Sequence, residues 1–410
     1  MSVVFIALSV LLLGAGILFS FDIGFLQLHP KRIVKNAFSN SGRAAFKAFC
    51  LSLGGIMGAG NIAGIALAVN RAGAGCVLWM LLSALICSSV KYREIFTAIK
   101  YKAASEKTRA FGPLFYMSRI KAFEHMPELF CLLCAAASFT TGNMVQANAL
   151  SEQLALSPVL RLTCAVTFTF VFALFSSCLK NGAMRFSAAA VPLMTVLYLL
   201  GCTCILFINI SRIPAAICEI IGGAFGIRQG VYGGLAGILV SARYGISIGL
   251  LSHEAGLGTA PIAHCEAKGA KAEISASLGI LEVYADTFLG AFFTALCIIV
   301  TRTKSAAQAF GSVFGKYGEV FVTVSLALFA LSSCISWHFY GVRAVKRLNN
   351  SKGIHVYTFT FCAVMLLSFF ISARRAYLLS DVTNALMAMT NITALLMVRR
   401  GKFFFSSLKS

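Results

Sequence analysis

The sequence predicts an all-α polytopic membrane protein with two interrupted helices. Of its 410 residues, 59% are hydrophobic and only 12% are charged, whereas soluble domains carry about 25% charged residues. Apolar runs of about twenty residues, long enough to cross a hydrocarbon core of about 30 Å, recur along the whole chain. Two of them contain the glycine-rich stretches Gly54–Ala66 and Ser252–Pro261. Because glycine costs a helix about 1 kcal/mol relative to alanine, these stretches predict breaks within spans.

The first span is predicted at 3–27, since Val3 to Phe21 carry no charge. The start of the chain has no basic residue, so we expect an uncleaved span and not a signal peptide. The glycine-rich segment 212–230 is too short for a span and is predicted to form a short interfacial helix. Ten further spans are predicted between charged or turn-rich stretches, at 48–70, 73–96, 128–152, 159–179, 187–210, 231–260, 275–300, 318–341, 354–372 and 377–398.

The net charge of +21 predicts the orientation of these spans. In a soluble chain such a charge would suggest a nucleic-acid partner, but in a membrane protein basic loops mark the cytoplasmic side. With the N-terminus outside, the inner loops hold 25 of the 35 lysines and arginines. We therefore expect the N-terminus outside, the C-terminus inside and anionic lipid at the inner face. Lys91–Lys102 is then expected at the inner surface, as a basic helix end.

No cofactor or catalytic centre is predicted. The 14 cysteines lie mostly in apolar runs and lack the spacing of a metal site, so we interpret them as free thiols. The sequence has no GxSxG, HExxH or P-loop motif. These observations argue against a membrane-embedded enzyme and an ATP-driven pump.

The two breaks divide the chain into two similar halves. Each break opens a group of five predicted spans, 48–210 and 231–398, and an odd number of spans gives the groups opposite orientations. Paired breaks in inverted halves are typical of secondary transporters, in which N–H ends suit a carboxylate and carbonyl ends a small cation. The first stretch alone also fits close helix packing, because Gly60 and Gly64 form a GxxxG pattern.

Seven blocks of sequence, in order along nearly the whole chain, resemble the alanine or glycine:cation symporter family, the sodium:alanine symporters. The blocks are MGAGNIAGIALAV (57–69), KYREIFTAIKY (91–101), GPLFYM (112–117), GNMVQAN (142–148), LLSHEAGLGTAPIAH (250–264), FALSSCISWHFYG (329–341) and DVTNALMAMTNITALL (381–396). The resemblance implies a leucine-transporter-like core of five plus five inverted helices with one extra N-terminal helix. It also implies import of alanine or glycine, L or D, with sodium as co-substrate. A proton-coupled permease of the same fold and a non-transporting amino-acid sensor are the alternatives.

The resemblance assigns substrate contacts to the first break. Backbone amides around Gly58, Ala59, Gly60 and Asn61 would hold the substrate carboxylate, and Gln146 would bind the amino group or the carboxylate. Ala59 stands where the family usually has threonine, so a hydroxyl that could meet ion or substrate is absent. The polar residues themselves leave another role open, since Asn61 and Gln146 could simply join helices.

The resemblance assigns further contacts to the second break and to the span at 318–341. Ser252 and Gly256 would contact the substrate, and Trp337 resembles an aromatic residue that closes the pocket, although it could also be interfacial. The implied sodium ligands are Gly58, Asn61, Ser332 and Ser333; the serine hydroxyls could instead bond their own helix. Val342 replaces an acidic residue of the family, which predicts the loss of a gating ion pair at the inner end.

Other polar residues near the breaks have structural or coupling roles in our interpretation. Glu254 is expected to brace the broken helix through unwound amides or Arg243, or to lie in the ion path. His253 replaces the usual asparagine, so it either makes uptake sensitive to protons or stays a neutral hydrogen-bonding ring. Asp286 is expected to join buried helices, and Asp381 to cap the last helix.

Overall fold

The computed structural model describes residues 3–39, 42–103, 110–154, 157–177, 182–226, 230–349 and 353–400. These residues are helical and contain no β-strand. Eight of their helices are long and apolar enough to cross a membrane, a bent pair makes a ninth, and two shorter apolar helices cover Ala7–Asp22 and Ile354–Ser368. Each predicted span therefore overlaps an apolar helix and the all-α class is confirmed, while the number of crossings stays a prediction.

The first half of the chain contains two helices that hydropathy did not predict, the single-turn α6 and the longer α2. This helix, α2, is amphipathic: Ile33 and Ala37 are buried, whereas Lys31, Arg32 and Lys35 are exposed. Its nine residues are too few and too polar to resemble a span. The helices of this half are α1 (Val3–Asp22), α2 (Pro30–Phe38), α3 (Arg43–Ile56), α4 (Ala63–Ala72), α5 (Cys76–Ala103), α6 (Leu114–Met117), α7 (Met126–Phe139), α8 (Val145–Leu154), α9 (Pro158–Ser177) and α10 (Gly182–Ile208).

The second half begins with a short helix inside the predicted segment 212–230, of which 227–229 lie outside the described residues. Its helices are α11 (Ile213–Ala224), α12 (Gly230–His253), α13 (Thr259–His264), α14 (Ala272–Val283), α15 (Phe292–Thr301), α16 (Ala306–Asn349), α17 (Ile354–Ser368) and α18 (Ala373–Arg400). π-Helical turns at Thr140–Met144 (η4) and Tyr284–Ala291 (η6) join α7 to α8 and α14 to α15. The predicted cap at Asp381 is wrong, because α18 begins at Ala373 and Asp381 lies in its third turn.

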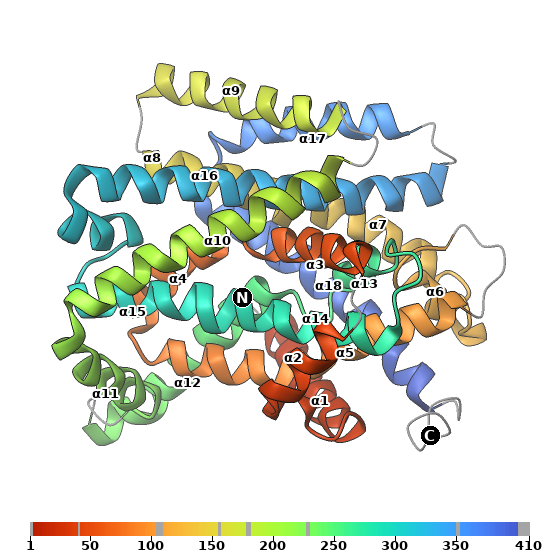
Figure 1. Cartoon of the computed structure of the whole chain (residues 1–410), viewed down its shortest axis with the longest axis horizontal. Helices are drawn as coiled ribbons and strands as arrows, with labels where there is room; N and C mark the ends of the chain where they lie inside the picture. The colour runs from red at the N-terminus through yellow and green to blue at the C-terminus, as the bar shows by residue number, and fades with distance from the viewer. Residues whose placement is uncertain are drawn as a thin grey trace.

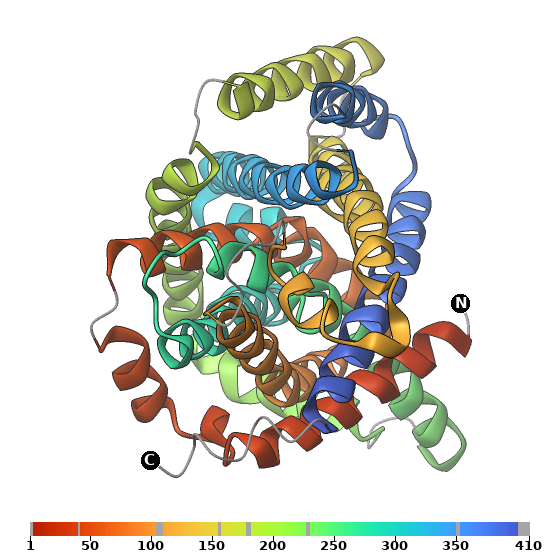
Figure 2. The same cartoon turned by 90° about the vertical axis from the view of Figure 1, so that its right-hand side faces the viewer.

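The broken helices lie inside the bundle. α3 packs between α10 and α16, and α5 packs against α1, α12 and α14. α9 and α17 form one edge of the molecule and α1 lies near the opposite edge (Figures 1 and 2). Every residue of α13 is buried. Protein therefore surrounds both breaks, as irregular backbone at membrane depth requires. The basic residues within 104–109 and 401–410, which contributed to the predicted orientation, lie outside the described residues.

Candidate functional site

The first break separates α3 from α4 and bends the pair by 56°. Its backbone passes through Gly58 and a short 3-10 turn, η2 (Ala59–Asn61). Gln146 of α8 lies against this turn, and its Oε1 accepts a hydrogen bond from the Ala59 amide at 2.8 Å. A Cβ atom added at Gly58 would lie 2.6 Å from the same oxygen. Glycine at position 58 therefore allows Gln146 to reach the unwound amide.

Two alanine substitutions in the break test this arrangement. Gly58→Ala is expected to push Gln146 off the Ala59 amide and to cost about 1 kcal/mol of unfolding free energy, the net value of a typical hydrogen bond. Gly60→Ala is the matched control, because a Cβ atom there would meet nothing within 4 Å. Thermal unfolding of the purified proteins measures both, and equal midpoints for the two variants would contradict the contact.

The second break lies between α12, which ends at His253, and α13. Gly256 and Gly258 have φ values of 87° and 81°, which L-residues rarely adopt. A Cβ atom at Gly256 would lie 2.7 Å from Leu12 of α1 and 3.1 Å from Ile392 of α18. The first and last helices of the chain therefore close directly on this break.

Glu254 braces the second break from within. Its carboxylate accepts hydrogen bonds from Trp337 Nε1 at 3.0 Å and from Thr259 Oγ1 at 2.9 Å. The residue is buried and has a φ of 50°. Thr259 and Trp337 thus hold the carboxylate, for which unwound amides, Arg243 or a place in the ion path were expected. The same bond occupies the indole N–H of Trp337, whose predicted role at the substrate pocket stays a prediction.

His253 makes a local hydrogen bond at the end of α12. Its Nδ1 accepts from the Ala255 amide at 3.1 Å, and the ring is fully buried. An asparagine side-chain oxygen can accept the same kind of bond. We therefore expect His253→Asn to keep uptake and to leave its pH profile unmoved. A shift of that profile, measured as initial uptake rate against pH, would instead assign the proton sensitivity to His253.

Four oxygen-bearing side chains meet between the two breaks. Asp286 Oδ1 accepts from Asn61 Nδ2 at 2.6 Å, and Asp286 Oδ2 accepts from Ser252 Oγ at 2.7 Å. Ser252 Oγ also lies 2.6 Å from Asn61 Oδ1, and Thr287 Oγ1 donates to Asp286 Oδ2 at 3.0 Å. All four side chains are buried. Carboxylate, amide and hydroxyl oxygens of this kind suit a hard cation. We call Asn61, Ser252, Asp286 and Thr287 the oxygen cluster.

Two serines of α16 lie against the end of α3, the first half of the first broken helix. Ser333 Oγ donates to the Gly55 carbonyl at 2.8 Å. Ser332 Oγ is buried and has no partner among the described residues. A Cβ atom at Gly54 would lie only 2.5 Å from Ser332 Oγ. The end of α3 therefore faces one engaged and one unengaged hydroxyl.

The structure thus divides the predicted sodium ligands into two groups. Asn61 belongs to the oxygen cluster, whereas Ser332 and Ser333 of α16 lie against the end of α3. Within the described ranges no hydrogen bond joins Asn61 to either serine. The sequence placed Asp286 only as a helix contact, although it bonds to both breaks. Its one available signal was an acid within an apolar run, which marks a functional position in a membrane span.

A buried charged cluster lies next to the second break, in contact with the end of α12. Lys91 Nζ donates to the His253 carbonyl at 3.0 Å and lies 3.6 Å from Glu282 Oε2. Glu282 also accepts from Ser52 Oγ at 2.7 Å and lies 2.6 Å from His264 Nε2. All four side chains, Lys91, Glu282, His264 and Ser52, are buried.

The prediction that Lys91–Lys102 forms a surface helix end is wrong at its start, where Lys91, Arg93 and Glu94 are buried. Partners from distant segments compensate these charges: Glu94 accepts from the Gly258 amide at 3.1 Å. A single sequence does not show such partners, so it favours placing each charge at the surface.

The C-terminal part of α16 carries ion pairs beyond Val342. Arg343 lies 2.6 Å from Glu266, and Arg347 lies 3.0 Å from Glu128. These pairs do not involve position 342, so the predicted loss of a gating ion pair there stays a prediction.

Comparisons with known proteins agree over nearly the whole chain. The profile of the family described as "Sodium:alanine symporter family" matches residues 1–407. The sodium/alanine symporter AgcS of Methanococcus maripaludis is 30% identical over 95% of this chain and 91% of its own. GlnT of Bacillus subtilis, named a probable sodium/glutamine symporter, is 28% identical over 98% of this chain and 87% of its own.

The fold is similar to that of a solved transporter. The crystal structure of MhsT in complex with L-phenylalanine superposes with a TM-score of 0.62 at 12% identity, over 88% of this chain and 90% of MhsT. MhsT has the leucine-transporter fold, so the predicted fold class is confirmed.

Proposed function

Because the chain belongs to the sodium:alanine symporter family, we propose that it imports a small neutral amino acid together with sodium by alternating access. The family and the fold are those of multi-pass membrane transporters of amino acids. The finer proposal is that the substrate is alanine or glycine, in the L or the D form. Such a cycle requires that ion and substrate bind the outward and inward states with different affinities.

The observation that carries the cation proposal is the oxygen cluster. Asn61 comes from the first break, Ser252 from the end of α12, and Asp286 from the π-helical turn η6. A sodium ion between them would exchange their mutual hydrogen bonds for ion contacts and would thereby tie both breaks together. A second position lies at the end of α3, where Ser332 has an unengaged oxygen beside Ser333.

We further propose that the Ala59 amide binds the substrate carboxylate, with Gly58 and Gly60 leaving space beside it. In the structure the Gln146 oxygen takes this amide. An incoming carboxylate would replace the Gln146 oxygen there, freeing the Gln146 side chain to meet the substrate. Gly256 and Ser252 approach from the second break, and Trp337 from α16.

The remaining predictions on placement become part of this proposal. The transporter is proposed to lie in the cytoplasmic membrane with its N-terminus outside and its C-terminus inside. Residues 48–210 and 231–398 are proposed as the inverted repeats, with 3–27 as the extra helix. Membrane lipid is the expected partner, and no organic cofactor is needed.

Transport assays in proteoliposomes test the proposal. Uptake of labelled L-alanine, D-alanine and glycine is measured under an inward sodium gradient and, separately, an inward proton gradient. We expect sodium-driven uptake that Asn61→Ala and Ser333→Ala abolish. Proton-driven uptake without a need for sodium would instead support the proton-coupled alternative. No uptake of any of the three amino acids by folded protein would contradict the transport proposal.

A further inference from the structure

A hollow of about 390 Å³ lies between α4, α12 and α18. Its lining carries three arginines, one from each helix: Arg71, Arg243 and Arg374. Asp381 of α18 is the acidic residue of the same lining. In the proposed orientation this hollow opens on the outer side of both breaks. Among the described residues, the three arginines outnumber the one aspartate, so the lining of the hollow is positively charged.

The acid and two of the arginines are not used within the protein. Asp381, Arg71 and Arg374 make no side-chain hydrogen bond and no ion pair within the part of the chain that the structure describes. Asp381 is half-buried, and apolar side chains such as Leu251 and Ile248 share the lining with it. Apolar walls strengthen the field of such charges. A half-buried carboxylate without a partner is costly unless a cation reaches it.

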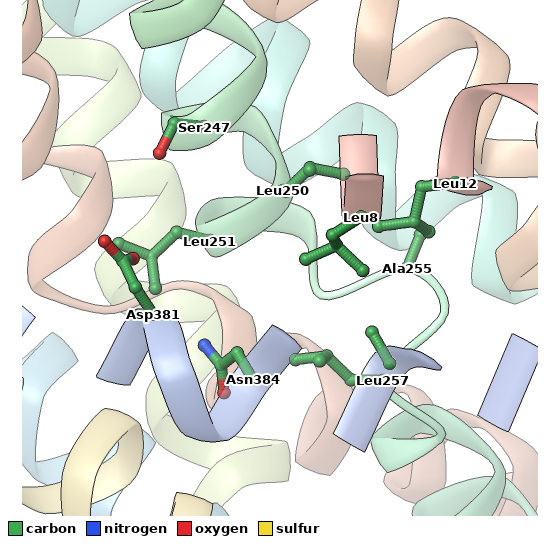
Figure 3. Close-up of a pocket in the computed structure, with 10 residues that line it drawn as sticks. Leu8, Leu12, Ser247, Leu250, Leu251, Ala255, Leu257, Asp381 and Asn384 are labelled. Carbon is green, nitrogen blue, oxygen red and sulfur yellow. The ribbon is translucent and has the colours of Figure 1, made fainter. Parts of the chain in front are cut away.

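A small space of about 20 Å³ adjoins the hollow, and Ala255 and Leu257 of the second break line it. Ser247, Leu251 and Asp381 line both spaces. Figure 3 shows Asp381 on α18 at one side of the small space and Leu8 and Leu12 of α1 at another. A space of this size holds little more than a water molecule or a methyl group.

We propose that this hollow is an outer binding site for the zwitterion of an α-amino acid with a small side chain. Asp381 binds the ammonium group, Arg71 and Arg374 bind the carboxylate, and the side chain points into the leucine-lined space. The inference rests on the proposed function and orientation. It adds a site that precedes the one at the breaks.

A chain of hydrogen bonds links the outer site to the first break. Asn384 lies next to Asp381 in the lining and accepts from Thr141 Oγ1 at 2.8 Å. The Thr141 carbonyl accepts from Gln146 Nε2 at 3.2 Å, and Gln146 Oε1 holds the Ala59 amide. Movement of Asn384 toward a ligand would therefore shift Thr141 and Gln146, and with them the hydrogen bond to the Ala59 amide.

The test measures how amino acid protects an introduced thiol. Ser247→Cys places a thiol in both spaces, and a methanethiosulfonate reagent modifies it in full-length protein held in nanodiscs. Peptide mass spectrometry must quantify modification at position 247 itself, because Cys204 and Cys218 are exposed as well. The Asn61→Ala background disables the site at the breaks. The probes are L-alanine, propionate, which lacks the ammonium group, and ethylamine, which lacks the carboxylate.

We expect L-alanine to protect the thiol at a concentration at least about tenfold below propionate or ethylamine. Asp381→Asn should raise the L-alanine concentration for half-protection about tenfold and bring it level with propionate. Arg374→Gln should raise the protective concentrations of L-alanine and of propionate, the two probes that carry a carboxylate. Arg375→Gln, next to Arg374 but outside the lining, is the matched control and should change neither.

Two results would overturn the outer site. One is that L-alanine protects the thiol in Ser247→Cys protein but not in Ser247→Cys/Asn61→Ala protein. Protection would then come from closure around the site at the breaks. The other is an Asp381→Asn variant that changes the modification rate without ligand but not the protective concentration, which would make Asp381 a gate residue. Equilibrium dialysis of labelled L-alanine against Asn61→Ala protein without the introduced cysteine repeats the measurement independently.

The failure of the outer site and that of the transport proposal are distinguishable. Sodium-driven uptake by wild-type protein combined with no outer protection would remove the outer site alone. Protection without uptake under any gradient would leave an amino-acid binding site and remove the transport proposal.

Discussion

Asp286→Ala is expected to abolish sodium-driven uptake, lowering the initial rate at least about 100-fold, equivalent to about 2.8 kcal/mol. The substitution removes the carboxylate that joins Asn61 to Ser252. A bound cation would lose a charged ligand, and two buried polar groups would lose a partner, at about 1–3 kcal/mol each. The measurement is uptake of labelled L-alanine into proteoliposomes across a series of sodium concentrations.

Two further variants make the Asp286 result specific. Asp286→Asn keeps the shape and some hydrogen bonds, so a comparable loss in this variant would assign the effect to charge. Glu219→Gln removes a carboxylate that pairs with the exposed Arg302 and should leave uptake unchanged. Wild-type sodium dependence in Asp286→Ala protein would remove the oxygen cluster as a cation site.

The second large effect is expected on stability. Lys91→Met should lower the free energy of unfolding by about 3–5 kcal/mol, because it leaves Glu282 as a buried charge without its cation. It also removes the donor to the His253 carbonyl at the end of α12. The double variant Lys91→Met/Glu282→Gln should lose less than the sum of the single variants. Unfolding of the purified proteins in detergent, followed by a shared probe, measures the cycle.

The same helix offers a matched control for Lys91. Lys100 lies 3.6 Å from Glu273, the same separation as in the Lys91 pair, but both side chains are about half exposed. Exposed pairs contribute about 0–1 kcal/mol, so Lys100→Met should hardly change unfolding. Equal losses for the two lysine variants, or strictly additive losses in the Lys91 cycle, would contradict a coupled buried pair.

Apolar length was a reliable guide to the helices and a poor guide to what lies between them. The spans and both breaks were predictable, because a run of apolar residues and a cluster of glycines are local signals. α2 was missed because only Ile33 and Ala37 of its nine residues are buried, and three of the others are basic. The start of α16 was missed because Lys316 and Glu319 interrupt the apolar pattern there.

The site was predictable in its residue types and only partly in its pairings. Asn61 and Ser252 were identified through resemblance, and the structure brings them together from opposite halves of the chain. Asp286 and Lys91 could not be placed in this way, because the partners of a buried charge lie far away in sequence. Hydrophobic patterning reports which face of a helix is buried, but it does not report which charge meets which.

The packing around Gly256 has a consequence for biosynthesis. The second break is held by Leu12 of α1 and by Ile392 of α18, which lie far apart in the sequence. Contacts between such distant segments form late, because the intervening chain must first be made and inserted. During translation α12 therefore enters the bilayer with an unsupported end, and only arrival of α18 completes its surroundings. Quality-control factors that survey unfinished membrane proteins would meet this break exposed until α18 has been inserted.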